Sequence, residues 1–291
     1  SPWRDENGRC QVVGRWSWGF RTEAADTSLG LARMTFPDGE VLDHVETEVV
    51  PVSAPCWYPG TRARVLFAAG DGKLYQYAFE PSGAPDAVSN GAETRPRELT
   101  WSCPLPVENG VYLTDPCWPS DPRMRNIVLV GLRATAAPVN AGRMAGPTQI
   151  WWLRLSDNGA SIVEAGRLLG ETTDGPEVTE RCPILGQSAS GRPVLAYLHR
   201  LPSQSLSLYV VDIEMDLERN CPRTVVGSGA KLAENCLASP PVFSKDGRWL
   251  NIVQLTDGAR NLRKIRLEEG LARPSVAAHP RLALADAASI R

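Results

Sequence analysis

The sequence predicts an all-β fold, a five-bladed β-propeller whose blades are four-stranded antiparallel sheets. Three observations favour this fold. A phrase recurs five times along the 291 residues, short apolar runs alternate with turn residues, and 24 Pro with 25 Gly interrupt any long helical stripe. The five units fill the chain, so a single propeller domain over residues 1–291 is expected.

Each copy of the phrase contains Pro and an aromatic or apolar anchor, followed by a polar loop and a short apolar run. The copies lie at 1–13, 54–67, 115–130, 182–197 and 240–253. Their anchors, Trp3, Trp57, Trp118, Leu185 and Phe243, are 54 to 67 residues apart. Compact propeller blades need about 40–50 residues, and surface loops accommodate the excess at little cost in closure entropy. We expect the anchors to pack neighbouring blades face to face, while Pro and Gly turn the chain from the innermost strand to the next.

The second copy indicates how a unit is built. Residues 65–68 and 73–79 are strand-like runs joined by Asp71-Gly72, which is the pattern of a β-hairpin. Corresponding runs occur at 29–35, 149–155, 207–212 and 261–267, and less regular ones at 41–45 and 160–164. Asp257-Gly258 is interpreted as a further hairpin turn rather than a metal ligand.

The two ends of the chain predict how the ring closes. The first copy begins at its motif, with no preceding sequence to supply an innermost strand. The chain continues past the fifth copy through 275–278 and 281–286. We expect this last stretch to pair beside the first blade and close the ring, which leaves only short, protected sheet edges.

Composition excludes several classes of partner. A net charge of −2 with 43% hydrophobic residues describes a globular chain that can bury a substantial core. The basic excess that many phosphate contacts require is missing, so nucleic acid is not expected as a partner. No apolar run approaches the roughly 18 residues of a membrane span.

The seven cysteines include no CxxC pair, which argues against zinc. Cys103 with Cys117, and Cys221 with Cys236, would close loops of similar length, and each disulfide would stabilise by roughly 3 kcal/mol in the chain-entropy model. Disulfides imply an oxidising compartment. The alternative is seven buried thiols in a cytosolic propeller. The odd count leaves at least one free thiol, for which Cys10 is the candidate.

The fifth copy, Pro241-Val-Phe243-Ser-Lys-Asp-Gly247-Arg-Trp-Leu250, resembles the repeat of TolB-like (WD40-like) β-propellers. The match is recognisable in the first three copies and degenerate in the fourth. The resemblance implies a periplasmic or extracellular (secreted) propeller that serves as a protein-interaction platform. TolB resembles a six-bladed ring, whereas this sequence has five units.

No catalytic residue, cofactor or metal site is expected, because no nucleophile elbow, HExxH or EF-hand pattern occurs. Glycoside hydrolysis would need two carboxyl groups at a defined separation. The acids just before or within the motifs are Asp5, Asp115, Glu180 and Asp286, and Asp115 is the best candidate for the channel mouth. The alternative for each acid is a turn or cap residue bonded to local backbone.

The function hypothesis that follows is a non-catalytic, exported propeller that acts as a protein-binding or assembly subunit of a cell-envelope or extracellular complex. Its insertions at 80–97 and 134–147 are the expected recognition surface. The alternative is a five-bladed glycoside hydrolase or carbohydrate-binding protein, in which carbohydrate takes the place of the partner protein.

Overall fold

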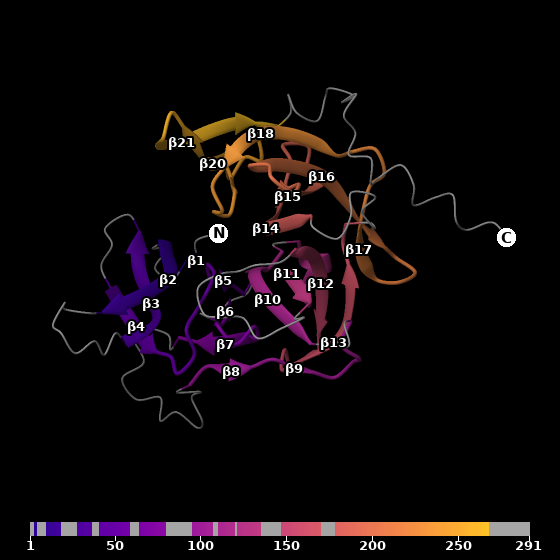
Figure 1. Ribbon diagram of the computed structural model, residues 1–291. Coiled ribbons are helices and arrows are strands. Elements are labelled where there is room, and N and C mark those ends of the chain that lie inside the picture. The colour runs from indigo at the N-terminus through magenta and orange to yellow at the C-terminus, as the bar shows by residue number, and fades with distance from the viewer. Residues whose placement is uncertain are drawn as a thin grey trace.

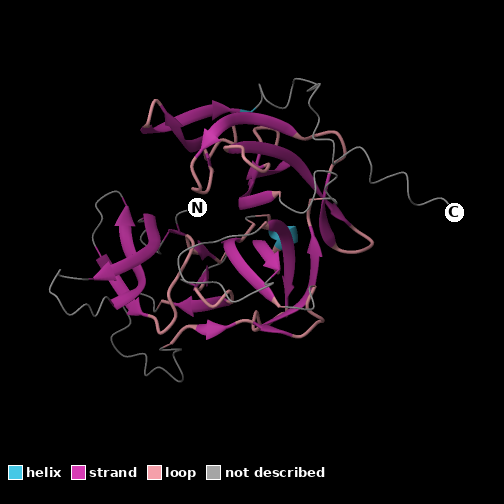
Figure 2. Ribbon diagram, in the orientation of Figure 1, coloured by secondary structure: helices cyan, strands magenta, loops and turns pink. Residues whose placement is uncertain are grey.

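The computed structural model consists almost entirely of β-strands (Figure 2), and the all-β prediction is confirmed. It describes residues 3–4, 10–18, 28–36, 41–58, 64–79, 95–106, 110–119, 121–134, 147–169 and 178–267. Within these ranges the single helical element is the 3₁₀ turn η1 (Pro122–Met124). The sheets follow one another along an arc in chain order (Figure 1).

The first two sheets each have four strands in chain order. The first contains β1 (Trp3–Arg4), β2 (Cys10–Trp18), β3 (Ser28–Phe36) and β4 (Val41–Glu46); the second contains β5 (Cys56–Trp57), β6 (Arg64–Ala68), β7 (Leu74–Ala78) and β8 (Arg97–Glu98). β1 pairs with β2, Trp3 opposite Gln11. The first unit therefore supplies its own first strand, and the expectation that it lacks one was wrong, because the motif itself forms that strand.

The third sheet has five strands. Four form an antiparallel meander, β10 (Val111–Cys117), β11 (Ile127–Ala134), β12 (Gln149–Leu155) and β13 (Ser161–Arg167). The fifth, β9 (Thr100–Trp101), pairs parallel with β13, with Thr100 opposite Ser161. The chain that leaves the second sheet thus borders the outer edge of the third.

The last two units share one eight-stranded sheet. Its strands are β14 (Thr179–Gln187), β15 (Pro193–Arg200), β16 (Leu206–Asp216), β17 (Cys221–Thr224), β18 (Ala230–Cys236), β19 (Val242–Phe243), β20 (Trp249–Thr256) and β21 (Ala259–Arg266). A single residue pair, Cys236 opposite Gln254, links β18 to β20. The Gln254 amide strengthens that link by donating to the Glu234 carbonyl at 2.6 Å.

Apolar clusters lie between consecutive units, as face-to-face packing of blades requires. Their buried members include Leu31 with Phe67 between units one and two, Leu66 with Val130 between two and three, Trp152 with Leu195 between three and four, and Ala196 with Leu250 between four and five. Each fully buried leucine contributes roughly 1.5–3 kcal/mol relative to exposure.

Three expectations from the sequence fall outside the described residues. They are ring closure by 281–286, most of the insertions at 80–97 and 134–147, and the acids Asp5 and Asp286. Among the described residues, no helix has the length and apolar character that crossing a membrane requires.

Candidate functional site

Each copy of the repeated phrase includes residues of the first strand of its unit and continues into the second strand. In the third and fourth units the residue three before the anchor has a positive φ, 49° at Asp115 and 51° at Cys182, and a proline follows it. The pairing register shifts there, between Thr114 and Cys117 and between Arg181 and Ile184. Proline cannot donate to the strand ladder and is tolerated at such a bulge. The expectation that these prolines turn the chain to the next strand was therefore wrong.

The bulge directs Asp115, the predicted channel acid, against the fourth unit. Arg181 Nε lies 3.1 Å from Asp115 Oδ2, and the Cys182 backbone N–H donates to the same oxygen at 3.3 Å. The Asp115 N–H donates to Ser53 Oγ of the second unit at 3.1 Å. The acid and the arginine side chains are only 6% and 20% exposed. Asp115 is thus an interior link among three units.

The second inner acid, Glu180, has the same kind of position. It is fully buried, and its Oε2 accepts the Ile150 backbone N–H of β12 at 3.1 Å. A glycosidase acid must deliver a proton to an accessible sugar. Asp115 and Glu180 are instead buried acceptors between units, so the structure does not unite them in an open catalytic pair.

The anchors pack against the preceding unit, or against the cluster shared with it, wherever their side chains are described. Trp118 meets the Tyr58 ring edge-on, with 4.5 Å between centroids, and donates through Nε1 to the Arg125 carbonyl at 3.0 Å. Leu185 lies in the cluster between units three and four, and Phe243 covers Gly186 of the fourth unit. Trp57 packs beside Phe79 of its own unit, 6.1 Å between centroids, and against the cluster that contains Leu31 of the first unit. The Trp3 side chain lies outside the described residues.

Six cysteines have described side chains, and all six are free. Cys103 packs against the cluster between units two and three, whereas Cys117 belongs to the cluster between three and four. Cys221 packs against that latter cluster, and Cys236 belongs to the cluster between units four and five. The structure therefore joins neither Cys103 with Cys117 nor Cys221 with Cys236. Similar loop lengths do not determine where the sulfurs pack, which is why the expectation failed.

Cys56 and Cys117 occupy the same place in their units, one residue before the anchor. Burial raises the pKa of the Cys56 thiol, and the nearby Cys117 raises it further, against the lowering effect of the Trp118 backbone N–H. Burial likewise raises the pKa of Cys117, while the Leu185 backbone N–H lowers it. Both thiols therefore stay protonated and weakly nucleophilic at neutral pH.

We expect a thiol-specific reagent at pH 8 to label Cys56, Cys117 and Cys182 slowly in the native protein, since burial raises all three pKa values. In denaturant without reductant, all seven cysteines should react. The chromophore released by the reagent measures both the rate of labelling in the native protein and the number of reactive thiols after denaturation. Three reactive thiols after denaturation would instead restore the two disulfides expected from the sequence.

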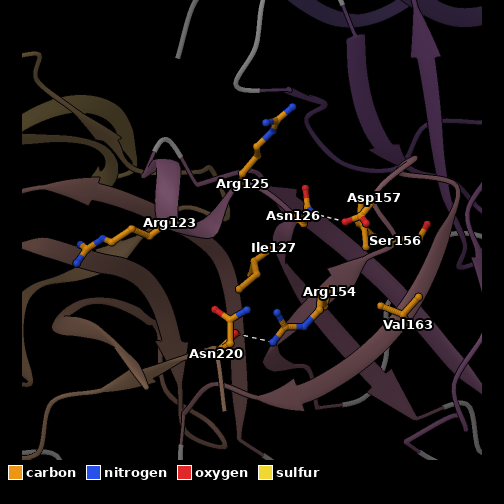
Figure 3. A pocket seen from close by; sticks show the side chains of 10 residues that line it. Arg123, Arg125, Asn126, Ile127, Arg154, Ser156, Asp157, Val163 and Asn220 are labelled. Atoms are coloured by element: carbon orange, nitrogen blue, oxygen red, sulfur yellow. Dashed lines mark hydrogen bonds between the residues drawn. The ribbon is translucent and has the colours of Figure 1, made fainter. Parts of the chain in front are cut away.

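A pocket of about 490 Å³ opens between the third and fourth units (Figure 3). The loop before β11, the end of β12 and the turn after it form most of the wall, and the turn between β16 and β17 completes it. The lining residues are Arg123, Arg125, Asn126, Ile127, Arg154, Leu155, Ser156, Asp157, Val163 and Asn220.

Hydrogen bonds fix the interior of this pocket. Arg154, whose side chain is 19% exposed, donates through Nε to Glu164 Oε2 at 2.8 Å and through Nη2 to the Asn220 carbonyl. Asn126 Nδ2 lies 3.4 Å from Asp157 Oδ1, at the opposite wall in Figure 3.

Two further arginines, Arg123 and Arg125, lie at the rim of the pocket. Arg123 forms an ion pair with Asp121 at 2.7 Å, and the hydrogen bonds from Arg123 lower the pKa of that carboxyl. Arg125 is exposed, projects away from the interior in Figure 3, and contacts Tyr58 Oη at 3.4 Å. The pocket therefore presents a preformed polar interior with arginine at its entrance.

The chemistry that this lining favours is recognition of carboxylates and other hydrogen-bond acceptors. Three lining residues carry guanidinium groups, which bind carboxylates bidentately, and one carries a carboxylate. None of the lining residues has an aromatic ring on which a sugar could stack. Sequence reasoning missed this pocket because its parts come from two units; the local signal was the close spacing of Arg123 and Arg125.

Successive antiparallel meanders packed face to face define a β-propeller, and the fold expected from the TolB-like repeat is confirmed. Similar solved structures include TolB from Acinetobacter baumannii (16% identity, 93% of this chain and 54% of that chain covered, TM-score 0.44). A protein of unknown function from Dyadobacter fermentans has 10% identity over 91% of this chain and 74% of its own, with a TM-score of 0.52.

A third similar structure is that of NanB with Optactamide, with 10% identity over 85% of this chain and 37% of its own and a TM-score of 0.50. The chain thus spans about half the length of the TolB chain that it matches. A scan of protein-family models and a search of curated proteins gave no match. At these identities the similarity concerns the fold alone.

Proposed function

We propose that the chain is one five-bladed propeller domain over residues 1–291, and that it acts as a non-catalytic, exported binding subunit of a cell-envelope or extracellular complex. The five copies of the phrase support the blade count, with the eight-stranded sheet counted as the fourth and fifth blades. The partner is a protein that binds at the pocket between the third and fourth units.

The observation that carries this proposal is the state of the pocket's polar groups. Arg154 is bonded to Glu164 and to the Asn220 carbonyl, and Asn126 faces Asp157. A catalytic site needs a nucleophile and base, or a pair of acids, poised toward substrate. The polar groups of this interior are instead hydrogen-bonded to one another and held in place, which suits a docking surface.

The entrance of the pocket carries the charged group that would attract the partner. Arg125 is exposed and close to the half-exposed Asn126 and the partly buried Tyr58, and arginine and tyrosine are enriched among the residues that dominate protein interfaces. An aspartate or glutamate of the partner would complement this arginine. The proposed partner therefore presents an acidic side chain to the rim.

Arg125→Glu should weaken partner binding about tenfold, because it replaces an attraction by a repulsion at the rim where the acidic side chain of the partner would bind. Wild-type and variant chains would be immobilised and exposed to a native envelope fraction. The matched control is Arg200→Glu, which reverses the charge of another exposed arginine. Arg200 is the last residue of β15, the second strand of the fourth unit.

A protein retained by the wild type and by Arg200→Glu, but not by Arg125→Glu, is the expected result. Equal retention by all three chains would reject the pocket as the docking surface. Retention of nothing by any of them would reject the binding function itself.

Carbohydrate hydrolysis, the alternative from the sequence, has less support. Asp115 accepts hydrogen bonds from Arg181 and Cys182 inside the protein, and the pocket lacks an aromatic lining residue. Turnover in a glycan hydrolysis screen that disappears on Asp115→Asn would revive that alternative.

A further inference from the structure

The last strand, β21, leaves an open edge. It pairs with β20 along its entire length, from Trp249 opposite Arg266 to Thr256 opposite Ala259. The turn between them, Asp257-Gly258, has positive φ at both residues, 52° and 78°, as a two-residue hairpin turn requires. Among the described residues no strand pairs with the other edge of β21, which lies on the outside of the last sheet (Figure 1).

The two faces of this hairpin differ. Leu250 and Ile252 point to the buried side, in the cluster shared with the fourth unit. On the opposite side the register places Val242, Leu255 and Leu262, because residues that pair across strands share a face. These three side chains are 57%, 45% and 78% exposed. The outer face of the last unit is therefore apolar and uncovered.

Positive charge surrounds these apolar residues. Arg260 pairs with Leu255, and Lys264 follows Leu262 on the same face, where its Nζ lies 4.5 Å from the Trp249 ring centroid. Residues 240–267 contain six Lys or Arg against two Asp and no Glu, a net charge of +4, although the whole chain carries −2. We call this surface of Val242, Leu255, Arg260, Leu262 and Lys264 the basic face.

The first unit has the opposite character. From Met34 to Thr61 the chain contains five acidic residues and no Lys or Arg. Within that stretch lies β4, the last strand of the first sheet, which in the described part of the chain pairs only with β3. Its exposed residues include Val41 and Glu46, and the exposed Glu48, which forms a solvent-exposed ion pair with Arg95 at 3.3 Å, follows shortly after. The first sheet thus ends in an acidic edge that also exposes an apolar side chain.

We propose that the basic face and β21 edge of one copy dock against the acidic β4 edge of a second copy. Strand addition would pair the open main-chain groups of both edges, and the opposite charges would set partner and orientation. The basic face is exposed within one chain, so its own first sheet does not cover it. The contact is head to tail, which generates a ring if the rotation closes and an open filament if it does not. This inference does not depend on the proposed partner at the pocket.

Sedimentation of the full chain over a range of concentrations tests the proposal. We expect reversible self-association that weakens as ionic strength rises, because exposed charges are screened by salt. Arg260→Glu with Lys264→Glu should raise the dissociation constant about tenfold or more, and so should Glu46→Lys with Glu48→Lys. Far-UV circular dichroism would verify that each variant is folded.

Mixing the two variants gives the decisive measurement. The acidified β21 of one variant can then meet the basified β4 of the other, and the two unaltered edges can meet as in the wild type, so an equimolar mixture should regain the association that each variant alone has lost. The control, Arg200→Glu with Arg219→Glu, reverses two exposed charges of the fourth unit and should associate like the wild type.

Two results would overturn the proposal. The wild type could remain a monomer at every concentration, or the mixture of variants could fail to associate. If the wild type is a monomer and both variants also melt at lower temperature, the contact belongs to closure within one chain. If charge reversal prevents folding, the neutral replacements Arg260→Gln with Lys264→Gln allow the same comparison of self-association with the wild type.

Discussion

Gly247→Ala should lower the free energy of unfolding by about 3 kcal/mol, through a single added methyl group. Gly247 has a φ of 67°, a conformation in which an L side chain is strained. A Cβ there would also meet the backbone of the fourth unit, at the Gln187 carbonyl oxygen and the Ser188 carbonyl group. Backbone cannot rotate away as a flexible side chain can, so the fourth and fifth units would have to separate locally.

Gly258→Ala is the matched control. Gly258 has a φ of 78°, but no atom lies within 4 Å of the position that the new methyl group would take, so only the conformational strain of about 1 kcal/mol applies. Chemical denaturation of both variants and the wild type gives the difference. If the two substitutions destabilise equally, the backbone of the fourth unit does not approach Gly247 closely enough to exclude a methyl group.

Asp115→Asn should destabilise the protein by about 3 kcal/mol, because it leaves the partly buried guanidinium of Arg181 without its carboxylate. Burial acts to lower the pKa of Arg181, but the charge of Asp115 and its hydrogen bond with Arg181 act to raise it, and the net shift is upward. Asparagine tolerates the positive φ at this position, so the substitution isolates the loss of charge. Thermal and urea unfolding measure the effect.

A double-mutant cycle separates the ion pair from the rest of the site. Arg181→Met removes the cation, and Asp115→Asn with Arg181→Met removes both charges. The double variant should be more stable than the sum of the two single effects predicts, since neither charge is left buried alone. Additive effects would mean that the pair at 3.1 Å contributes no coupling between the third and fourth units.

The strands were predictable because their signals are local. The run at 149–155 coincides with β12 (Gln149–Leu155), and the run at 261–267 overlaps β21 (Ala259–Arg266). Asp71-Gly72 and Asp257-Gly258 form turns with a positive φ at each glycine. Alternation of side chains and the backbone freedom of glycine act over a few residues, so no tertiary information is needed.

The site was not predictable, because its parts meet only after folding. Asp115 and Arg181 are 66 residues apart, and Arg154 reaches the carbonyl of Asn220 across two units. The local rule that proline ends a strand gave the wrong result at Pro116, which a bulge retains inside β10. Charge clusters in separate loops likewise give no sign of which loops will be neighbours.

At strand β9 the boundary of the repeat in the sequence differs from the boundary of the sheet in the fold. Thr100 and Trp101 belong to the second copy in sequence, yet they hydrogen-bond along the outer edge of the third sheet, where the Ser102 N–H also donates to the Ile162 carbonyl at 2.8 Å. Excising one copy at its sequence boundaries would therefore remove a strand from the neighbouring sheet. Duplication, deletion or transplantation of a unit succeeds as a clean exchange only when the cut is moved upstream of β9, between β8 and β9, so that β9 stays with the third sheet.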